Sequence, residues 1–443
     1  MILLINPKTS KPTEFQSEYF REPNLGILYL AAQLDKYDIF VDILDLEQYF
    51  QLPEFDLKRV IENKITDYNI IGITSLTNNF KFVLDIAKTI KNYDPKKMVI
   101  LGGPHVSFLF NEILINEESI DFICIFESEE SFLQLSQLLL MLYQTNKKLD
   151  DVEHKLNQIK GIAYKNSMDA LIFTGYPEVI NIESLPLPAR YKLSQENYYY
   201  KVANIIVNRG CPNQCSFCSR QRMFKNIRIR SIKSILSEIR DIISLQTYNY
   251  INFYDNINID RKFFKEFCKI FIEHHIKIPW GCELRIDTLS REDAFLMKQA
   301  GCNLVATGIE SASIQVLKKN FKYQNPEYVR RGVKNLKHVG IPIQAYFVLG
   351  LPGETEHTFQ ETVNFIKALP LDKDDEINFF AATPYPGSRL WDQQKHFGIK
   401  IIEKDFSKYD CQHVIFETKN LSLTKLEKFY KIAKEIEDFF KEN

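Results

Sequence analysis

Short apolar runs alternate with amphipathic stretches along two long blocks of the chain, and this alternation constrains the fold most strongly. In residues 1–145 each apolar run suits one buried strand, and the spacing leaves room for a helix before the next. Strand, helix and strand in succession form the unit of a doubly wound, Rossmann-like parallel sheet. The predicted strands are Ile2–Ile5, Phe40–Leu44, Ile70–Thr74, Met98–Leu101 and Phe122–Phe126, and the predicted helices are Gly26–Leu34, Phe80–Tyr93 and Glu130–Tyr143.

Residues 201–400 repeat the rhythm in six strand–helix units. Six units predict a partial (β/α)6 barrel of the TIM type, because the complete barrel needs eight. The predicted strands are Asn204–Val207, Tyr250–Tyr254, Trp280–Leu284, Leu304–Gly308, Ile343–Val348 and Glu376–Ala381, with helices at Ile232–Ser244, Lys262–His274, Arg291–Ala300, Asn325–Val339 and Thr355–Ala368.

Residues 146–200 and 401–443 break the rhythm. Gly161–Tyr164 and Ala170–Thr174 predict a hairpin, and the prolines of Leu185–Arg190 exclude both helix and central strand. We interpret 146–200 as a hairpin and linker between two domains, 1–145 and 201–400. Residues 401–443 are predicted to form a short C-terminal helical tail, with an amphipathic helix at Glu427–Phe440.

The composition narrows the class of protein. The 443 residues suggest two to three domains at roughly 150 residues each. A net charge of −1 gives no general attraction to nucleic acid, and no apolar run approaches the ~20 residues that span a membrane. Met1–Pro7 has no basic segment and is interpreted as a first strand rather than a secretory signal. We therefore expect a cytoplasmic protein with a small-molecule substrate, no nucleic-acid partner and no membrane span.

Three of the eight cysteines, Cys211, Cys215 and Cys218, stand in a CxxxCxxC run. A structural zinc ion needs four protein ligands, and neither a histidine nor a second CxxC lies close in sequence. A cubane cluster held by three cysteines keeps one iron without a protein ligand, which favours a 4Fe-4S site over the alternatives of a zinc knuckle or buried thiols. The other cysteines are interpreted as core residues: Cys124, Cys268, Cys282, Cys302 and Cys411.

The cysteine run follows the first predicted barrel strand directly, and active sites of such barrels lie at the carboxyl ends of strands. Gly210 and Pro212 permit the tight turn that lets three sulfurs converge, and Phe217 would shield one face of a cluster. The position therefore predicts catalytic metal chemistry.

These residues carry a resemblance to a known family. The run, with an aromatic residue before its third cysteine, resembles the radical S-adenosylmethionine (SAM) superfamily. The chain is most similar to the subgroup with an N-terminal cobalamin (B12)-binding domain, in motifs that occur in the same order. They are Leu3–Pro7, Gly26–Ala32, Ile71–Thr74, Gly102–His105, Leu185–Arg190, Arg209–Pro212, Phe253–Asn256, Gly308–Ser311 and Gly350–Glu354.

The resemblance implies that the open iron binds the amino and carboxylate groups of SAM, and that an external one-electron reductant of the flavodoxin or ferredoxin type reduces the cluster. Arg285 would pair with the SAM carboxylate, although a structural ion pair between Glu283 and Arg285 is the alternative. The implied SAM contacts are Phe217, Asp255, Asn256, Glu283, Arg285, Glu310, Ser311, Gly350, Pro352 and Gly353.

The resemblance also implies cobalamin at the carboxyl edge of the N-terminal sheet. The chain has no DxHxxG motif, so His105 is interpreted as a hydrogen-bonding or corrin-edge residue rather than a cobalt ligand. Where the family often has Gly-Glu-Gly-Glu, this chain has Phe126-Glu-Ser-Glu, and the larger side chains would crowd a backbone that approaches the corrin. The implied contacts are Asn6, Pro7, Thr74, Ser75, Thr77, Gly102, Gly103, Pro104, His105 and Glu127.

The activity implied by the resemblance is methylation of an unactivated carbon in a small-molecule or lipid-like precursor. The alternatives are ring formation, ring contraction or oxidation with the same cofactors, methylthiotransferase-like RNA modification, and a non-catalytic B12 or SAM sensor. The methylthiotransferase alternative needs further cluster cysteines in the N-terminal domain, where Cys124 stands alone. The sensor alternative predicts loss of the cluster cysteines, and all three are present.

Overall fold

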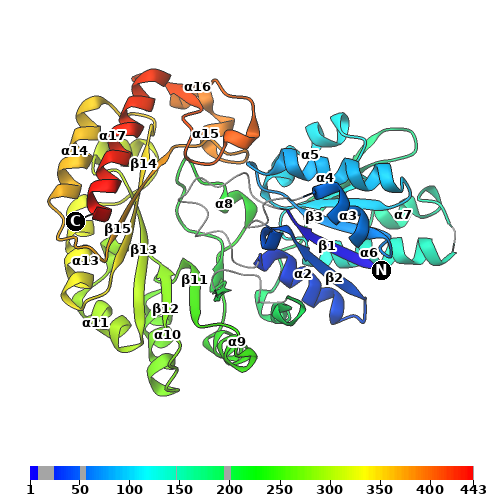
Figure 1. Cartoon of the computed structure of the whole chain (residues 1–443), viewed down its shortest axis with the longest axis horizontal. Coiled ribbons are helices and arrows are strands. Elements are labelled where there is room, and N and C mark those ends of the chain that lie inside the picture. Colours follow the sequence, from blue (N-terminus) through cyan, green and yellow to red (C-terminus); the bar gives the residue numbers. More distant parts are fainter. Residues whose placement is uncertain (8–23, 50–55, 146, 194–200, 443) are drawn as a thin grey trace. The chain divides into compact units, whose positions relative to one another are not determined.

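The computed structural model describes residues 1–7, 24–49, 56–145, 147–193 and 201–442 (Figure 1). The chain divides into two compact units, one of residues 1–200 with 223–225 and one of residues 201–222 with 226–443. In the described residues, no helix is both long and apolar enough to cross a bilayer.

The first unit is built on a seven-stranded sheet in the order β2-β1-β3-β4-β5-β6-β7. Strands β1 to β5 are parallel, which confirms the predicted doubly wound sheet. The strands are β1 (Ile2–Asn6), β2 (Val41–Asp45), β3 (Ile70–Thr74), β4 (Met98–Gly102), β5 (Phe122–Cys124), β6 (Ile162–Lys165) and β7 (Leu171–Phe173). The predicted hairpin is β6–β7; it extends this sheet, because β6 pairs antiparallel with β5.

Helices cover both faces of this sheet. The crossover β1–α2–β2 runs one way along the sheet and the crossovers through α3, α4 and α5 run the other way; right-handed crossovers in opposite directions lie on opposite faces. The elements are α2 (Leu25–Asp35), η1 (Leu46–Tyr49), α3 (Leu57–Ile65), α4 (Phe80–Tyr93), α5 (Pro104–Asn116), α6 (Glu129–Thr145), η2 (Asp150–Val152), α7 (Glu153–Leu156), η3 (Ile182–Ser184) and η4 (Arg190–Lys192).

The sequence patterns missed α3 and α5 and extended β5 too far. The Gly-Gly-Pro sequence before α5 resembles a turn, yet Pro104 is the first residue of the helix, a position that needs no N–H donor. The predicted strand Phe122–Phe126 ends at Cys124, because Phe126 has a left-handed φ of +58° that no strand accommodates.

The second unit is a partial barrel, as predicted, of six parallel strands in the order β15-β14-β13-β12-β11-β8. The strands are β8 (Val202–Ile205), β11 (Tyr250–Asn256), β12 (Trp280–Glu283), β13 (Cys302–Glu310), β14 (Ile343–Leu349) and β15 (Glu376–Ala381). The helices between them are α9 (Ile232–Leu245), α10 (Arg261–Glu273), η6 (Ile286–Thr288), α11 (Arg291–Gln299), α12 (Ile314–Lys319), α13 (Pro326–His338) and α14 (Glu356–Lys367).

Smaller elements complete the rim and the C-terminus of this unit. They are β9 (Asn208–Arg209), α8 (Arg220–Met223), β10 (Arg228–Ile229), α15 (Arg389–Asp392), α16 (Gln394–Phe397), β16 (Ile399–Ile401), η7 (Phe406–Lys408), β17 (Phe416–Thr418) and α17 (Leu423–Glu442).

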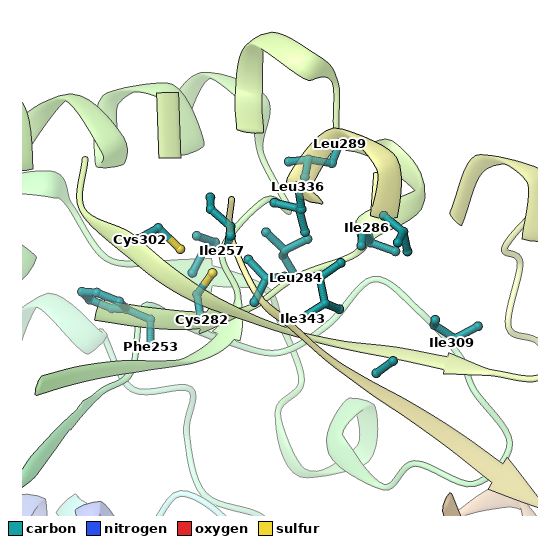
Figure 2. Close-up of a cluster of buried hydrophobic side chains, with 14 of the residues drawn as sticks. Phe253, Ile257, Cys282, Leu284, Ile286, Leu289, Cys302, Ile309, Leu336 and Ile343 are labelled. Atoms are coloured by element: carbon teal, nitrogen blue, oxygen red, sulfur yellow. The ribbon is translucent and has the colours of Figure 1, made fainter. Parts of the chain in front are cut away.

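Alternate residues of the barrel strands, such as Ile343, Ala345 and Phe347 of β14, belong to one buried apolar core. In the apolar core, Phe253 contacts Trp280 edge-on at a centroid distance of 5.6 Å. Figure 2 shows Cys282 and Cys302 in the same core beside Ile257 and Leu284. Four of the five scattered cysteines are buried as predicted, whereas Cys411 is only partly buried.

Helix α17 closes the exposed edge of the barrel sheet with charged side chains. The N–H group of Phe379 in edge strand β15 donates to the Glu437 carboxylate, and Lys434 Nζ donates to the Phe379 carbonyl at 3.3 Å. Lys434 also donates to both Glu437 oxygens, at 2.7 and 2.9 Å. The pair therefore replaces the neighbouring strand that an edge strand lacks.

We expect Glu437→Gln to lower the free energy of unfolding of this unit by about 1–3 kcal/mol, because a buried charge-assisted bond is weakened and Lys434 loses its counter-charge. Urea unfolding followed by tryptophan fluorescence measures it, since both tryptophans, Trp280 and Trp391, lie in this unit. Glu435→Gln, at an exposed position of the same helix, is the control. Equal stability of the two variants would contradict the role of Glu437.

Candidate functional site

A two-stranded ribbon closes the loop that carries the three clustered cysteines. Strands β9 and β10 pair antiparallel, so the chain enters and leaves the loop side by side. Gly210 has a φ of +92°, and a Cβ there would overlap the backbone of Asn226. Glycine is therefore required at the turn directly before Cys211.

Ser216 anchors the middle of this loop, between Cys215 and the third cysteine. Its N–H donates to the Asn320 carbonyl at 2.9 Å, its hydroxyl donates to the Asn320 side-chain oxygen at 2.7 Å, and its carbonyl accepts from Leu390 at 2.9 Å. The Asn320 amide also donates to the Pro352 carbonyl at 2.9 Å. Ser216 and Asn320 are fully buried, so the cysteine loop is fixed to the loops that follow β13 and β14.

Arg285 supports the first cysteine through an intermediate side chain. Its guanidinium donates to the Asn213 side-chain oxygen at 3.0 Å, and the Asn213 amide donates to the Cys211 sulfur at 3.5 Å. Hydrogen bonds to sulfur help to set the potential of an iron–sulfur cluster. The guanidinium also forms a two-point ion pair with Asp287, at 2.7 and 3.1 Å. Arg285 thus pairs with Asp287 and not with Glu283, and it keeps few donors for a ligand.

The three thiols are close enough for their charges to interact. Burial raises the pKa of Cys215 to about 11, while Lys322 lowers it and the other two cysteines add to the rise. Burial of its sulfur also raises the pKa of Cys218, although the residue as a whole is exposed. Among the described residues, no three His, Cys, Asp or Glu side chains are arranged to hold a single metal ion. By donor chemistry, three thiolates without a fourth protein ligand fit an iron–sulfur cluster.

Glu310 and Lys322 form a largely buried ion pair next to this loop. Lys322 Nζ lies 2.9 Å from Glu310 Oε1, and the Lys322 side chain is only 12% exposed. Glu310 has a left-handed φ of +64°, and a Cβ on Gly308 would overlap its carboxylate. Desolvation opposes the charge of Lys322, but Glu310 and Cys215 outweigh it and raise the pKa. Lys322 is therefore a stable cation beside Cys215, and no sequence motif had marked it.

The other predicted SAM contacts, on strands β11 to β13, differ in their surroundings. The side chain of Asp255 lies outside the described part of the structure. The Asn256 side-chain oxygen accepts from the Arg285 N–H at 3.0 Å, and the buried Ser311 hydroxyl hydrogen-bonds to a hydroxyl of α14 at 3.3 Å. Both groups are thus engaged within the protein. The residue Glu283 as a whole is exposed at the end of β12. Its carboxyl group is nevertheless desolvated by surrounding atoms, which raises the pKa of Glu283.

The loop after β14 depends on its glycines for its shape. Gly350 and Gly353 have φ values of +83° and +97°, which only glycine adopts without strain. A Cβ on Gly350 would lie 3.3 Å from Leu426 of α17, so internal packing also favours glycine there. Phe217 of the cysteine loop packs in an apolar cluster that includes Leu351 of this loop. The predicted contacts from these two loops thus lie close together.

At the carboxyl edge of the N-terminal sheet, Gly102 is the open position. A Cβ there would meet no atom closer than the Cys124 carbonyl oxygen, 4.0 Å away. Gly103, by contrast, has a φ of +101°, and a Cβ on it would overlap the Ser75 backbone. A small residue that faces open space at this edge fits a ligand that approaches the backbone, as the cobalamin tail would.

His105 lies below this edge rather than on it. The side chain is 1% exposed, its ring lies 4.3 Å from the Phe80 ring, and Nδ1 hydrogen-bonds to the Thr77 hydroxyl at 3.3 Å. Burial lowers the pKa of His105 to about 3, so the imidazole is neutral. This placement supports the hydrogen-bonding interpretation of His105 over that of a cobalt ligand.

The remaining predicted cobalamin contacts line the same edge of the sheet. The buried Asn6 amide donates to Asp45 at 2.8 Å and so links β1 to β2. Ser75 is fully buried, and its N–H donates to the Gly102 carbonyl at 2.8 Å. The others are Pro7 after β1, Thr74 at the end of β3, Pro104 at the start of α5 and the buried Glu127 after β5.

Glu354 makes the stability of the barrel depend on pH. Its buried carboxylate accepts from the Gly350 N–H at 2.6 Å, yet burial raises the pKa of Glu354 from 4.5 to about 8. The folded protein keeps a proton that the unfolded chain loses, so stability falls as the pH rises from about 4.5 to 8.

We expect Glu354→Gln, which mimics the protonated acid, to remove this pH dependence, which amounts to at most about 1.4 kcal/mol of unfolding free energy per pH unit. Urea unfolding at several pH values measures it, and an unchanged slope would contradict it.

Comparison with known proteins identifies the family of each unit. Residues 205–366 match the model of the radical SAM superfamily, and residues 17–136 match that of the B12 binding domain. The chain is 28% identical over 422 residues to an uncharacterized methyltransferase of Pyrococcus horikoshii, with 93% of this chain and 86% of the relative covered. It is 27% identical to the bacteriochlorophyllide d C-12(1)-methyltransferase of Chlorobaculum tepidum, with 98% and 86% covered.

A third relative has a different activity. The anaerobic magnesium-protoporphyrin IX monomethyl ester cyclase of Rubrivivax gelatinosus is 28% identical over 398 residues, with 88% of this chain and 68% of the relative covered.

A solved structure shares the fold over almost the whole chain. It is the radical SAM methyltransferase TsrM from Kitasatospora setae, with cobalamin and a 4Fe-4S cluster bound. The TM-score is 0.74 at 15% identity, with 99% of this chain and 88% of that chain covered. The two family models, in the order expected from the motifs, assign a 4Fe-4S cluster, SAM and cobalamin as cofactors. The chain therefore belongs to the radical SAM superfamily, in the group with an N-terminal B12-binding domain.

Proposed function

We propose that this protein is a cobalamin-dependent radical SAM methyltransferase that methylates an unactivated carbon of a small-molecule or lipid-like precursor. The observation that supports it most is the combination of the two family matches with relatives named as methyltransferases over nearly the full chain. When bound, the cluster supplies the electron that cleaves SAM, and cobalamin carries the methyl group.

The residues of the cysteine loop have separate roles in this proposal. Cys211, Cys215 and Cys218 bind the cluster, and the buried Ser216 holds their loop in place. Asn213 donates to the Cys211 sulfur and is itself held by Arg285. These bonds fix the sulfurs before any ligand arrives, which lowers the cost of organising the site.

Lys322 is the best candidate for the partner of the SAM carboxylate. Arg285 is occupied by Asp287 and Asn213, whereas Lys322 donates only to Glu310 among the residues that the structure describes. An ammonium group has three donors, so two are left for a ligand. Lys322 also lies close enough to Cys215 for its charge to lower the pKa of that thiol.

The protein needs a source of electrons. We propose an external one-electron reductant of the flavodoxin or ferredoxin type, in a reducing cytoplasm. The eight cysteines are all free thiols, which suits such a compartment.

Ring formation is the second candidate, because the cyclase of Rubrivivax gelatinosus is as similar in sequence as the methyltransferases. The two reactions differ in what becomes of SAM. Methyl transfer converts one SAM to S-adenosylhomocysteine and a second to 5′-deoxyadenosine, whereas cyclisation yields only the latter.

Anaerobic turnover of the reconstituted protein separates these candidates. With reductant, hydroxocobalamin and SAM labelled in its adenosine, we expect label in both S-adenosylhomocysteine and 5′-deoxyadenosine. Cys218→Ala should lose its iron and form no 5′-deoxyadenosine, whereas Cys302→Ala, a core variant, should keep both. Release of 5′-deoxyadenosine without S-adenosylhomocysteine would favour the cyclase; iron retained in Cys218→Ala would contradict the cluster site.

We expect Lys322→Met to weaken SAM binding by roughly 10- to 100-fold, the range for the loss of a hydrogen bond to a charged group. Equilibrium dialysis with the iron-loaded protein measures it. Lys318→Met, at an exposed position of α12, is the matched control, and Lys322→Arg should bind more tightly than Lys322→Met. Unchanged affinity at full iron content would rule out contact between Lys322 and SAM.

A further inference from the structure

Five basic side chains form one surface of the second unit, beside the cysteine loop. Lys318 and Lys319 are exposed at the end of α12, Lys395 is exposed on α16, and Lys419 is exposed directly after β17. The Arg389 side chain, at the start of α15, is partly exposed. We call these five residues the basic face.

Ring contacts join three helices of the basic face. The Arg389 guanidinium lies over the Phe321 ring, 4.8 Å from its centroid, and Phe321 stands two residues after the end of α12. The Phe321 ring meets the Phe397 ring edge-on at 6.3 Å. Phe397 is the last residue of α16, so α12, α15 and α16 place their basic side chains around one pair of rings.

Two further contacts attach Lys419 to both sides of this group. Its N–H donates to the carbonyl of Gly398, directly after α16, at 2.7 Å. The amide of the adjacent Asn420 donates to the loop after β14 at 3.2 Å. In that loop, a Cβ on Gly353 would lie 2.8 Å from the Lys319 side chain. The basic face is therefore one continuous surface.

The positive charges of the basic face have no carboxylate partners. Among the described residues, none of its five cations forms an ion pair. Asp392, on the same helix as Arg389, is paired with Arg222 instead. The whole chain has a net charge of −1, so this concentration of positive charge is local and does not follow from the composition.

The basic face reaches the cysteine loop through α15. The Arg389 guanidinium donates to the side-chain oxygen of the exposed Gln214 at 2.6 Å, and Gln214 directly precedes Cys215. The N–H of Leu390, the next residue of α15, donates to the Ser216 carbonyl at 2.9 Å. Helix α15 thus holds the loop on both sides of Cys215, so a single residue separates the basic face from a cysteine of the proposed cluster site.

We propose that the basic face is the docking surface for an acidic one-electron carrier protein, an inference that rests on the external reductant proposed above. Flavodoxins and ferredoxins have negatively charged surfaces. Opposite charges speed the encounter of two proteins and fix their mutual orientation. A carrier docked here delivers its electron beside Cys215: the carrier is oxidised by one electron, and the cluster is reduced by that electron.

A nucleic acid suits this face less well. Proteins that bind single strands combine basic side chains with exposed aromatic rings on which the bases stack. Phe397 is only 3% exposed, and the Arg389 guanidinium covers the Phe321 ring. The basic face therefore offers charge without a free ring.

Charge reversal on the basic face tests the docking. One protein combines Lys318→Glu with Lys395→Glu and keeps Arg389, which holds the loop. The matched control combines Lys265→Glu with Lys269→Glu, at exposed positions of α10, and changes the net charge equally. Each iron-loaded, full-length protein is titrated with oxidised flavodoxin to obtain the dissociation constant. Formation of 5′-deoxyadenosine from SAM is then timed with reduced flavodoxin and with reduced methyl viologen.

We expect the basic-face variant to bind flavodoxin roughly 10-fold more weakly than the control at low salt. The difference should shrink at ~1 M salt, where charges are screened within ~3 Å. The rate with reduced flavodoxin should fall with the affinity. The rate with methyl viologen, a small cation that needs no docking surface, should not change.

Equal flavodoxin affinities of variant and control, or an equal loss of rate with methyl viologen, would overturn the docking proposal. Binding of single-stranded RNA that only the basic-face variant loses, with flavodoxin binding unaffected, would assign the face to nucleic acid and overturn it too. A wild type that forms no 5′-deoxyadenosine with either donor would contradict the proposed function, whereas the flavodoxin affinities would still decide the docking surface.

Discussion

The hydrogen bonds between Ser216 and Asn320 are the constraint on which the candidate radical site depends. The cysteine loop contains no regular structure between Gly210 and Ser219, so its own backbone does not fix where the sulfurs lie. The buried pair at 2.7 Å ties the loop to the end of α12, and the further bond from Asn320 to Pro352 brings in the loop after β14. Three loops that are far apart in sequence thus share one buried polar centre. Such a centre is stable only while every member is paired.

Strained backbone marks the key positions of both units. Glu310 in the barrel and Phe126 in the N-terminal sheet both have left-handed φ values at the carboxyl end of a strand. In each case a partner holds the strain: Lys322 binds the Glu310 carboxylate, and Ser107 accepts the Phe126 N–H.

Apolar patterns in the sequence predicted the regular strands and helices. They missed features that depend on contacts between residues brought together only by the fold. The strand at Ile70–Thr74 and the helix at Phe80–Tyr93 were predicted to the residue, since apolar period and burial agree there. Helix α5 was missed because its Gly-Gly-Pro start resembles a turn. Lys322 belongs to no sequence motif. It is a candidate SAM contact only because the fold brings it close to Glu310 and Cys215. Similarly, the partner of Arg285 was not predictable by spacing, because Asp287 and Glu283 are equally distant in sequence.

At the proposed cluster site, the burial of Cys215 and Cys218 would make loading of the cluster a proton-linked process. Iron binds thiolates, yet burial raises the pKa of Cys215 to about 11 and also raises that of Cys218, so protons must leave as the metal arrives. Lys322 eases this loss at Cys215 by its positive charge. While the thiol is neutral, the Glu310 carboxylate is the counter-charge of the buried Lys322 ammonium. Once the sulfur is anionic, the Lys322 ammonium interacts with two negative groups, Glu310 and Cys215. The proposed SAM carboxylate would be a third, so its binding to Lys322 would depend on the charge of Cys215.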